Sequence, residues 1–350
     1  MKMKNGIWVF LDNEGPCTLN DNAQEIMVAL AELRGLGDAG INSYRNASNI
    51  DDIWGDFHRI PRDPAYSSGH TLKVVLPFFK AMGATEEWLY RFASKSLRVV
   101  PNIQTVMPNL DRKFNVRQIS TSYEFFIRSF CELVGFDFNK ARCTRVNNFD
   151  KIPITQEEAA LLREFMLEAA AMPVIQYDQK TGEVILEHQP YYERFTQFIW
   201  ETVWNMEVGQ FLRAVHPIGQ TQKREAVEQI CKEHNVPLEQ TFYAGDSQTD
   251  LQCVELIRGK GLTMMFNGKG KVCRISDIMY IGEDARAIEE VADRFAELGR
   301  EGVLRYYSPS REAECDGLIT AVTPENIDYL HELSVKKRKE FRGVHIGALT

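Results

Sequence analysis

The chain has 350 residues, of which 44% are hydrophobic and 26% charged, and this is the composition of a soluble globular protein with one large or two modest domains. Its net charge of −8 argues against nucleic acid as the main partner. The seven cysteines show no Cys-x-x-Cys spacing, and no apolar run is long enough to cross a bilayer. We therefore expect a cytoplasmic protein with reduced thiols, no structural zinc, no membrane insertion and no signal peptide.

The first predicted strand covers residues 7–11 and leads directly into two acidic residues. Five apolar residues precede Asp12, and Glu14 follows just before a Gly-Pro turn. An apolar run of this length, bounded by turn residues, is typical of a buried strand in a parallel sheet. Open α/β sheets bind ligands at the carboxyl ends of their strands. Asp12 is therefore a candidate nucleophile and metal ligand, and Glu14 a candidate general acid and base; the alternative is an acidic, solvated turn.

Residues 20–113 are predicted to form a mostly helical insertion between two strands of the core. Apolar residues recur at helical spacing over residues 26–33, and further helices are expected after residue 71. Residues 46–70 are polar and rich in turn formers, so we interpret them as a loop. Four side chains of this loop are weak candidates for a substrate pocket, with a surface position as the alternative: Trp54, His58, Arg62 and His70.

A second strand is predicted over residues 114–119, and it runs directly into Ser120 and a following helix. A hydroxyl at the carboxyl end of a strand, next to a helix N-terminus, suits a phosphate oxygen. Ser120 is therefore a candidate phosphate ligand, and the alternative is a simple helix N-cap. Residues 153–212, with a capping box and an aromatic-rich helix, are interpreted as a second insertion. The pattern leaves open whether this insertion is a second cap or packs on the core.

Two further motifs lie in the second half of the chain. Lys223 falls in the first turn of a predicted helix, where a positive charge is unfavourable against the helix dipole unless it faces an anion. A solvated surface lysine is the alternative. A short apolar strand then ends in Gly245 and Asp246, with Asp250 four residues later. Two carboxylates near one site are costly unless a cation neutralises them, and their oxygens suit Mg²⁺.

The remaining segments are predicted to complete the core. Further strands are expected over residues 262–266 and 278–281, followed by helices over residues 284–298 and 323–333. The charge run at residues 336–339 is interpreted as a solvated helix end.

The signals at strand ends and helix starts together fit phosphoryl transfer through an aspartyl-phosphate. In this interpretation Asp12 attacks phosphorus in line, while Glu14 protonates the leaving oxygen and then activates water. Mg²⁺ binds Asp12 and Asp246, and Ser120 and Lys223 hold the phosphate oxygens that gain charge.

These residues, in this order, resemble the motifs of the haloacid dehalogenase-like (HAD) superfamily. Residues 12–14 resemble its first motif, Ser120 the second, Lys223 the third and residues 245–250 the fourth. The resemblance implies an α/β fold, with a Rossmann-like core of a parallel sheet and helices on both faces, Mg²⁺ dependence and, most often, phosphatase activity. It also implies that the backbone carbonyl of Glu14 is a metal ligand. In the fourth motif, Asp246 is expected to bind the metal, and Asp250 to bind it directly or to hold the residues that do.

The resemblance also divides the chain into domains. Residues 1–19 and 114–350 are expected to form the HAD-like core, with the second insertion at about 153–212, and residues 20–113 a helical cap. The run Asp-Asn-Glu-Gly-Pro, followed by Asn-Asp-Asn-Ala, further resembles an archaeal HAD-like group labelled subunit R of energy-converting hydrogenase A.

The leading hypothesis is a capped, Mg²⁺-dependent phosphatase of a small phosphorylated metabolite. One residue departs from the family pattern, because Glu14 stands where Asp is usual, and a misplacement of about 1 Å can lower a rate on the order of 10²-fold. The second hypothesis is therefore a catalytically weak or inactive regulatory or binding subunit of a larger complex. The sequence leaves open whether the chain binds a protein partner or forms a homo-oligomer. A third hypothesis, a receiver-like phospho-acceptor, is weaker because the nucleophile would lie on the first strand of a far longer chain.

Overall fold

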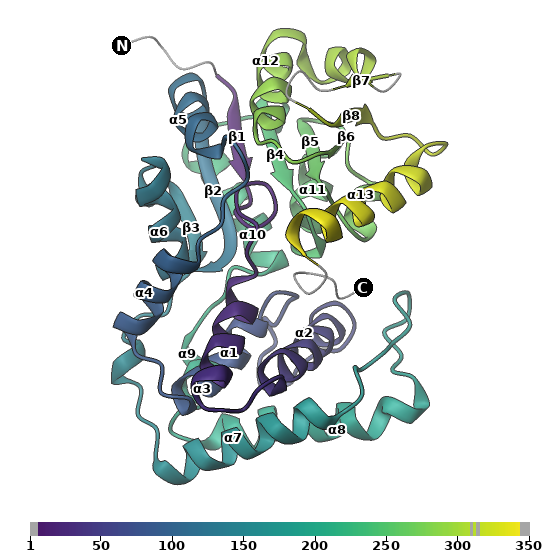
Figure 1. The fold of residues 1–350 in the computed structure, drawn as a ribbon. Coiled ribbons are helices and arrows are strands. Elements are labelled where there is room, and N and C mark those ends of the chain that lie inside the picture. The colour runs from purple at the N-terminus through teal and green to yellow at the C-terminus, as the bar shows by residue number, and fades with distance from the viewer. Residues whose placement is uncertain (1–5, 309–310, 313–315, 344–350) are drawn as a thin grey trace.

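The structure is a computed structural model that describes residues 6–308, 311–312 and 316–343 (Figure 1). Its centre is an eight-stranded sheet in the order β3-β2-β1-β4-β5-β6-β8-β7. Neighbouring strands from β3 to β6 are parallel, and β8 and β7 add an antiparallel edge beside β6. The strands are β1 (Trp8–Leu11), β2 (Asn115–Tyr123), β3 (Ala141–Thr144), β4 (Thr241–Gly245), β5 (Leu262–Phe266), β6 (Ile278–Ile281), β7 (Arg311–Glu312) and β8 (Leu318–Ala321).

The described part of the chain contains thirteen α-helices. They are α1 (Asn22–Leu33), α2 (Ala39–Asp56), α3 (Thr71–Ala81), α4 (Glu86–Ser96), α5 (Ile103–Lys113), α6 (Glu124–Val134), α7 (Gln156–Ala171), α8 (Gln189–Gln197), α9 (Gln210–Ala214), α10 (Gln220–Glu233), α11 (Leu251–Ile257), α12 (Arg286–Tyr306) and α13 (Ile327–Arg342). No helix of the described residues combines the length and the apolar character that crossing a membrane requires.

Strand β1 is central because both of its faces are buried. Val9 and Leu11 belong to one hydrophobic cluster, which α5, α6 and α12 also join. Trp8 and Phe10 belong to the other cluster, with residues of α10, α11 and α13. Each large apolar side chain buried in this way contributes roughly 1.5–3 kcal/mol to stability. The predicted α/β class, with a parallel sheet covered on both faces, is confirmed, and the antiparallel edge of β8 and β7 is an addition to it.

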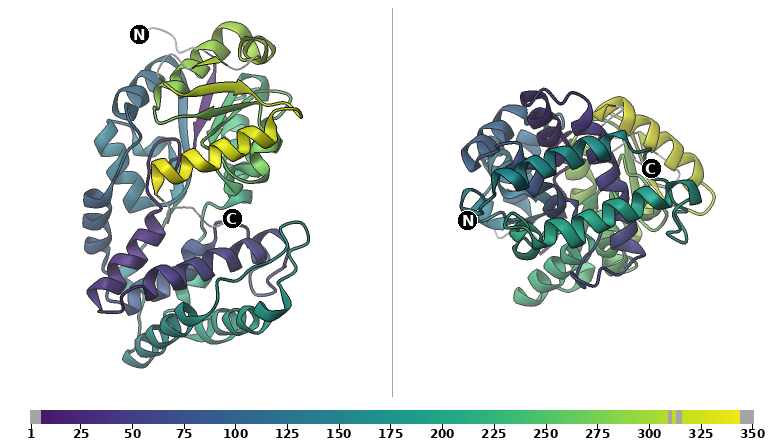
Figure 2. Two further views of the ribbon diagram at one scale, coloured as in Figure 1. Left: turned by 45° about the vertical axis from the view of Figure 1, so that its right-hand side comes forward. Right: turned by 90° about the horizontal axis from the view of Figure 1, so that it is seen from below.

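A second body lies beyond the carboxyl ends of the parallel strands (Figures 1 and 2). It contains α1, α2 and α3, and α7 from the second insertion packs along α2 and α3. In contrast, α4 and α5 lie beside the sheet, where both pack against α6. We therefore propose that the cap consists of α1–α3 with α7–α9, whereas α4 and α5, within the predicted cap at residues 20–113, belong to the core.

The prediction of a loop over residues 46–70 is wrong for its first part, because α2 continues to Asp56. Asn46 donates a hydrogen bond to the carbonyl of Ala169 (3.0 Å), and Asn49 donates one to the carbonyl of Ile175 (2.9 Å). Both asparagines are buried. Residues with a low helix propensity are therefore used here to bond a distant segment, and this tertiary contact overrides the local preference.

Candidate active site

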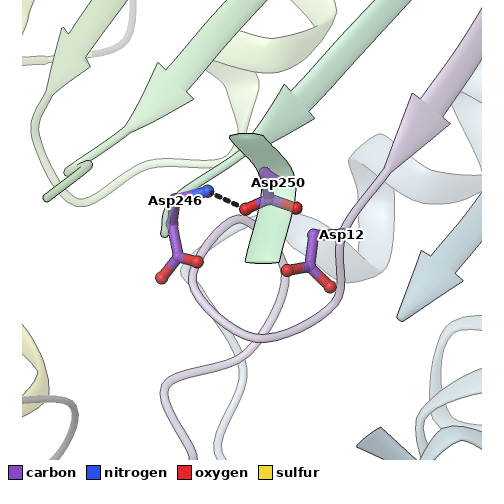
Figure 3. Close-up of side chains that lie close together, drawn as sticks. All are labelled: Asp12, Asp246 and Asp250. Carbon is purple, nitrogen blue, oxygen red and sulfur yellow. Dashed lines mark hydrogen bonds between the residues drawn. The ribbon is translucent and has the colours of Figure 1, made fainter. Parts of the chain in front are cut away.

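Three buried carboxylates meet at the carboxyl ends of β1 and β4 (Figure 3). Asp12 follows β1, and its backbone N–H donates to the carbonyl of Ala244 (2.9 Å), which ties this strand end to β4. Asp246 and Asp250 follow β4, and one oxygen from each of the three carboxylates lies within 4.8 Å of the others. The structure thus brings together the first and fourth motifs, which are more than 230 residues apart in the sequence.

Lys223 reaches this cluster from the first turn of α10 and is completely buried. Its Nζ donates to Oδ2 of Asp12 (2.7 Å) and to Oδ1 of Asp250 (2.8 Å). Burial by itself would lower the pKa of Lys223, but the attraction of Asp12 and then of Asp250 outweighs it and raises this pKa above its usual value. The ammonium group therefore stays charged and holds the Asp12 carboxylate in place.

The negative charges of the cluster also act on Asp12. Burial raises the pKa of Asp12 well above its usual range, the charge of Lys223 opposes this shift, and the charges of Asp250 and Asp246 add to it. Lys223 offsets only part of the charge of the three carboxylates, and two arginines meet the charge of Asp246.

Asp250 uses both of its carboxylate oxygens within the protein. In addition to Lys223, Oδ1 accepts a hydrogen bond from the hydroxyl of Tyr243 (2.6 Å). Oδ2 accepts bonds from the backbone N–H groups of Asp246 (2.9 Å) and Ser247 (3.0 Å). A Cβ at Gly245 would overlap this carboxylate, so only glycine fits there. These contacts support a role for Asp250 in positioning Asp246 and Lys223.

Asp246 is paired with two arginines that no motif of the sequence indicated. Arg338 and Arg342 of α13 both donate to its Oδ2, Arg342 at 2.9 Å. Although burial disfavours the charged carboxylate, Arg338 and then Arg342 hold the pKa of Asp246 below its usual range. The prediction of a solvated helix end at residues 336–339 is therefore wrong for Arg338, which is 5% exposed.

Glu14 lies on the cap side of the cluster. Its Oε1 accepts hydrogen bonds from the backbone and side-chain N–H groups of Asn22 and from the hydroxyl of Ser122 (2.8 Å). Burial, followed by repulsion from Asp21, raises the pKa of Glu14 to about 7. Ser122 lies in β2, and Asn22 begins α1. The carboxyl group of Glu14 therefore bridges β2 and α1.

Gly15 explains how this loop approaches the fourth motif so closely. Its φ is +101°, and a Cβ at this position would overlap the Asp246 carboxylate. Any other residue would push the loop after β1 away from Asp246.

Ser120 lies within β2, which continues to Tyr123, beyond the strand end predicted at residue 119. The side chain is buried, and its Oγ accepts a hydrogen bond from the backbone N–H of Ser122 (3.2 Å). Ser120 and Asp12 line the same cavity, which has a volume of about 210 Å³. Pockets for drug-sized ligands span roughly 300–1,000 Å³, so this cavity is smaller than such a pocket.

The cap contributes the opposite wall of this cavity. Asp51, Asp52 and Asp56 of α2 line it, together with Tyr177 and Gln179 from the second insertion. Burial and the charge of Asp51 raise the pKa of Asp52 to about 8. The four candidates from the predicted loop, Trp54, His58, Arg62 and His70, are not among the lining residues. Trp54, for example, is 1% exposed and packs against Tyr66, Phe195 and Trp200 inside the cap.

The donor set at this site fits a hard divalent cation. Carboxylate oxygens are the ligands that Mg²⁺ prefers. In the described part of the chain no hydrogen bond reaches Oδ1 of Asp246, whereas both oxygens of Asp250 accept several. Asp12 and Asp246 are therefore the side chains best placed to hold such an ion.

The cap meets the core at Gly69, where backbone freedom and space are both restricted. Its φ is +98°, and a Cβ would lie 3.1–3.2 Å from Thr121, Gly219 and Thr249 of the core. We expect Gly69→Ala to lower stability by about 1–3 kcal/mol and to lift the cap from the core. Thermal unfolding measures the first effect. For the hydrolysis proposed in the next subsection, we expect kcat/KM to fall about tenfold, because closure of a cap positions a substrate.

Gly37→Ala is the matched control for this substitution. Gly37 also has a positive φ (+53°), but a Cβ at this position would have no atom within 4 Å of it. The Gly37→Ala variant should have the same backbone strain as Gly69→Ala but should keep the kcat/KM of the wild type. Equal losses of kcat/KM in both variants would contradict the assignment of Gly69 to cap closure.

A scan of protein-family models and a search of curated proteins gave no match. Among solved structures, gene product AF1437 from Archaeoglobus fulgidus aligns over 97% of both chains, with a TM-score of 0.79 and 23% identity. Phosphoserine phosphatase in its apo form aligns over 82% of this chain and 98% of its own, with a TM-score of 0.46 and 14% identity. A HAD family hydrolase from Salmonella enterica serovar Typhi aligns over 77% of this chain and 65% of its own (TM-score 0.40, 12% identity). The likeness to AF1437 establishes a shared fold over nearly the whole chain, and the predicted α/β fold is confirmed.

Proposed function

We propose that this protein is a Mg²⁺-dependent phosphatase that hydrolyses the phosphoric monoester of a small metabolite through an aspartyl-phosphate on Asp12. The observation that carries the proposal is that Asp12, Asp246, Glu14 and Ser120 line one small cavity, while Lys223 contacts Asp12 from behind its wall. These groups are the nucleophile, the cations and the proton carrier that this reaction needs.

Each residue has a role that follows from its contacts. An oxygen of the Asp12 carboxylate attacks phosphorus, and Lys223, which already donates to that carboxylate, orients it and offsets the charge of the phosphate. Ser120 lines the cavity and provides a hydroxyl donor for a phosphate oxygen. Asp250 holds Lys223 and the backbone of Asp246.

A Mg²⁺ ion would be held by Asp12, Asp246 and the backbone carbonyl of Glu14. When bound, the ion supplies positive charge that offsets the repulsion between the nucleophile and the phosphate.

Glu14 is the general acid and base of this proposal. A pKa of about 7 lets the group both donate and accept a proton at neutral pH. Its side chain is one methylene longer than the Asp usual at this position, and it is anchored by Asn22 and Ser122. This anchoring supports an active site built around the longer acid, in preference to a relict site.

The proposal is tested by hydrolysis of p-nitrophenyl phosphate with Mg²⁺ and with a chelator, beside a panel of small sugar and acyl phosphates. The panel is needed because the cavity of about 210 Å³ can reject an aromatic ester. We expect phosphate release that requires the metal. Absence of release across the panel, from protein shown to be folded, would contradict the proposal and favour a binding or regulatory subunit.

Substitution of Glu14 by glutamine separates the two halves of the reaction. Glutamine keeps an oxygen that can accept the bonds of Asn22 and Ser122 but carries no transferable proton. p-Nitrophenolate leaves without protonation, whereas the later attack of water on the aspartyl-phosphate still needs a base. We expect a rapid burst of about one equivalent of p-nitrophenol, followed by turnover reduced about 10²- to 10⁴-fold. Steady turnover at the wild-type rate without a burst would exclude Glu14 as the base.

A further inference from the structure

Helix α13 presents three buried polar residues on one face, at the carboxyl ends of the core strands. Ser334, Arg338 and Arg342 are spaced four residues apart, which places them in a row along the helix. Ser334 donates to the carbonyl of Gly268 (2.7 Å), and the two arginines continue the row to Asp246. The row thus fixes both guanidinium groups at the active-site cavity, which both of them line.

The two arginines differ in how their donors are used. Arg342 donates from Nε to the carbonyl of Leu19 (3.2 Å), from Nη1 to Asp246 and from Nη2 to the carbonyl of Asn20. It therefore holds the segment that leads from the core to the cap. Its contacts are those of a positioning residue.

Arg338 uses only one of its three nitrogens in the hydrogen bonds of the described residues. Nη1 donates to Asp246 and, at 3.4 Å, to the carbonyl of Asn267. Nε is buried without a hydrogen-bond partner in the described part of the chain. A guanidinium carries five N–H donors, and an unpaired buried donor is unfavourable. Arg338 therefore has donors to offer to a further acceptor.

The charges around Arg338 indicate that this acceptor is an anion. Among the described residues, Arg338 and Arg342 both pair with the carboxylate of Asp246, so two guanidinium groups share one negative charge at the cavity wall. The charges of Asp12 and Asp250 are engaged by Lys223. Like charges held together away from water repel one another, and an anionic group between them relieves this repulsion.

We propose that Arg338 binds a carboxylate of the substrate, so that the substrate is a small phosphomonoester that carries a carboxylate. This inference rests on the proposed phosphatase function, because Asp12 and Ser120 line the same cavity and would hold the phosphate of the same molecule. The planar fork of arginine matches a carboxylate in a bidentate manner. Because the cavity is small, the phosphate and the carboxylate of such a substrate are separated by only a few bonds.

The experiment compares two esters, phosphoglycolate and hydroxyethyl phosphate, which differ in whether the second carbon is a carboxylate or a hydroxymethyl group. We expect the wild-type protein to prefer phosphoglycolate in kcat/KM by about ten- to hundredfold, which corresponds to one charge-assisted bidentate contact. Arg338→Gln should reduce this ratio to near one, and Arg338→Lys should restore part of it. The ratio cancels any effect on Asp246 that both esters share.

A matched control is Lys339→Gln on the same helix, because Lys339 is exposed. It should leave the ratio unchanged. Circular dichroism and thermal unfolding establish that each variant is folded. An unchanged ratio in folded Arg338→Gln would overturn the inference, and so would an equal loss for both esters, because Arg338 would then serve the transferred phosphate or Asp246 alone.

Calorimetric binding separates this inference from the proposed function. The same two esters are titrated, in chelator, into protein that carries Asp12→Asn, with and without Arg338→Gln. Tighter binding of phosphoglycolate that is lost with Arg338 supports the carboxylate site even if no ester is hydrolysed. Equal binding of both esters overturns the proposed carboxylate site, even if hydrolysis is observed.

Discussion

Replacement of Asp12 by asparagine is expected to abolish Mg²⁺-dependent hydrolysis, with a loss of about 10³-fold or more in kcat. The amide has nearly the same shape and can still accept the hydrogen bond of the Asn13 N–H (2.7 Å), but it is not a nucleophile. Lys223 keeps its second partner, Asp250, at 2.8 Å. The variant should therefore fold like the wild type, which thermal unfolding checks.

Asp328→Asn makes the same chemical change far from the cavity. Asp328 pairs with Arg274 in an exposed ion pair, and such pairs contribute about 0–1 kcal/mol. We expect its kcat to stay within about twofold of the wild type, since a surface substitution alters stability by about 0.5 kcal/mol or less. More than about a tenth of the activity remaining in folded Asp12→Asn would identify another nucleophile, since such losses usually exceed about 10³-fold.

Replacement of Lys223 by methionine is expected to reduce both stability and activity. In the described residues Lys223 is the cation that contacts Asp12, and it also neutralises Asp250. Breaking a buried ion pair by removing one partner costs about 3–5 kcal/mol, because the remaining charge is left uncompensated. We expect a decrease of this size in the free energy of unfolding, measured by urea denaturation, and a fall in kcat of about 10²-fold or more.

The double variant Lys223→Met with Asp250→Asn distinguishes electrostatics from packing. Lys223→Met leaves the Asp250 charge without its partner. Removal of that charge should therefore recover part of the lost stability, as is usual for two residues in contact, while activity stays low. The control is Lys260→Met at an exposed lysine, with an expected change of about 0.5 kcal/mol or less. A Lys223→Met protein as stable as the wild type would show that the carboxylates are neutralised without the lysine.

The strand pattern allowed the core to be predicted from the sequence. Residues 7–11 form a continuous apolar run because both faces of β1 are buried, and such runs are characteristic of parallel sheets. The polar residues that follow β1 and β4 therefore mark one edge of the sheet within the sequence itself. For this reason Asp12, Asp246 and Asp250 could be placed together from the sequence alone.

The residues that complete the site carry no such local signal. Ser122 and Asn22 are ordinary polar residues until the fold brings them to Glu14. Arg338 stands within a run of four basic residues, and its neighbours Lys336 and Lys339 are exposed. The run is typical of a solvated helix end, and only the packing of α13 against the core selects Arg338 for burial.

What the sequence determined by itself was the periodic burial of the core strands and the chemistry at their ends, since both depend on short-range patterns that each segment carries alone. What the tertiary structure decided was the helical state of residues 46–56 and the arginines at Asp246. These features depend on contacts between segments more than 90 residues apart, such as Asn46 with Ala169 and Arg338 with Asp246. Their free energy comes from burial and hydrogen bonds that exist only once the chain is folded, so no local pattern encodes them.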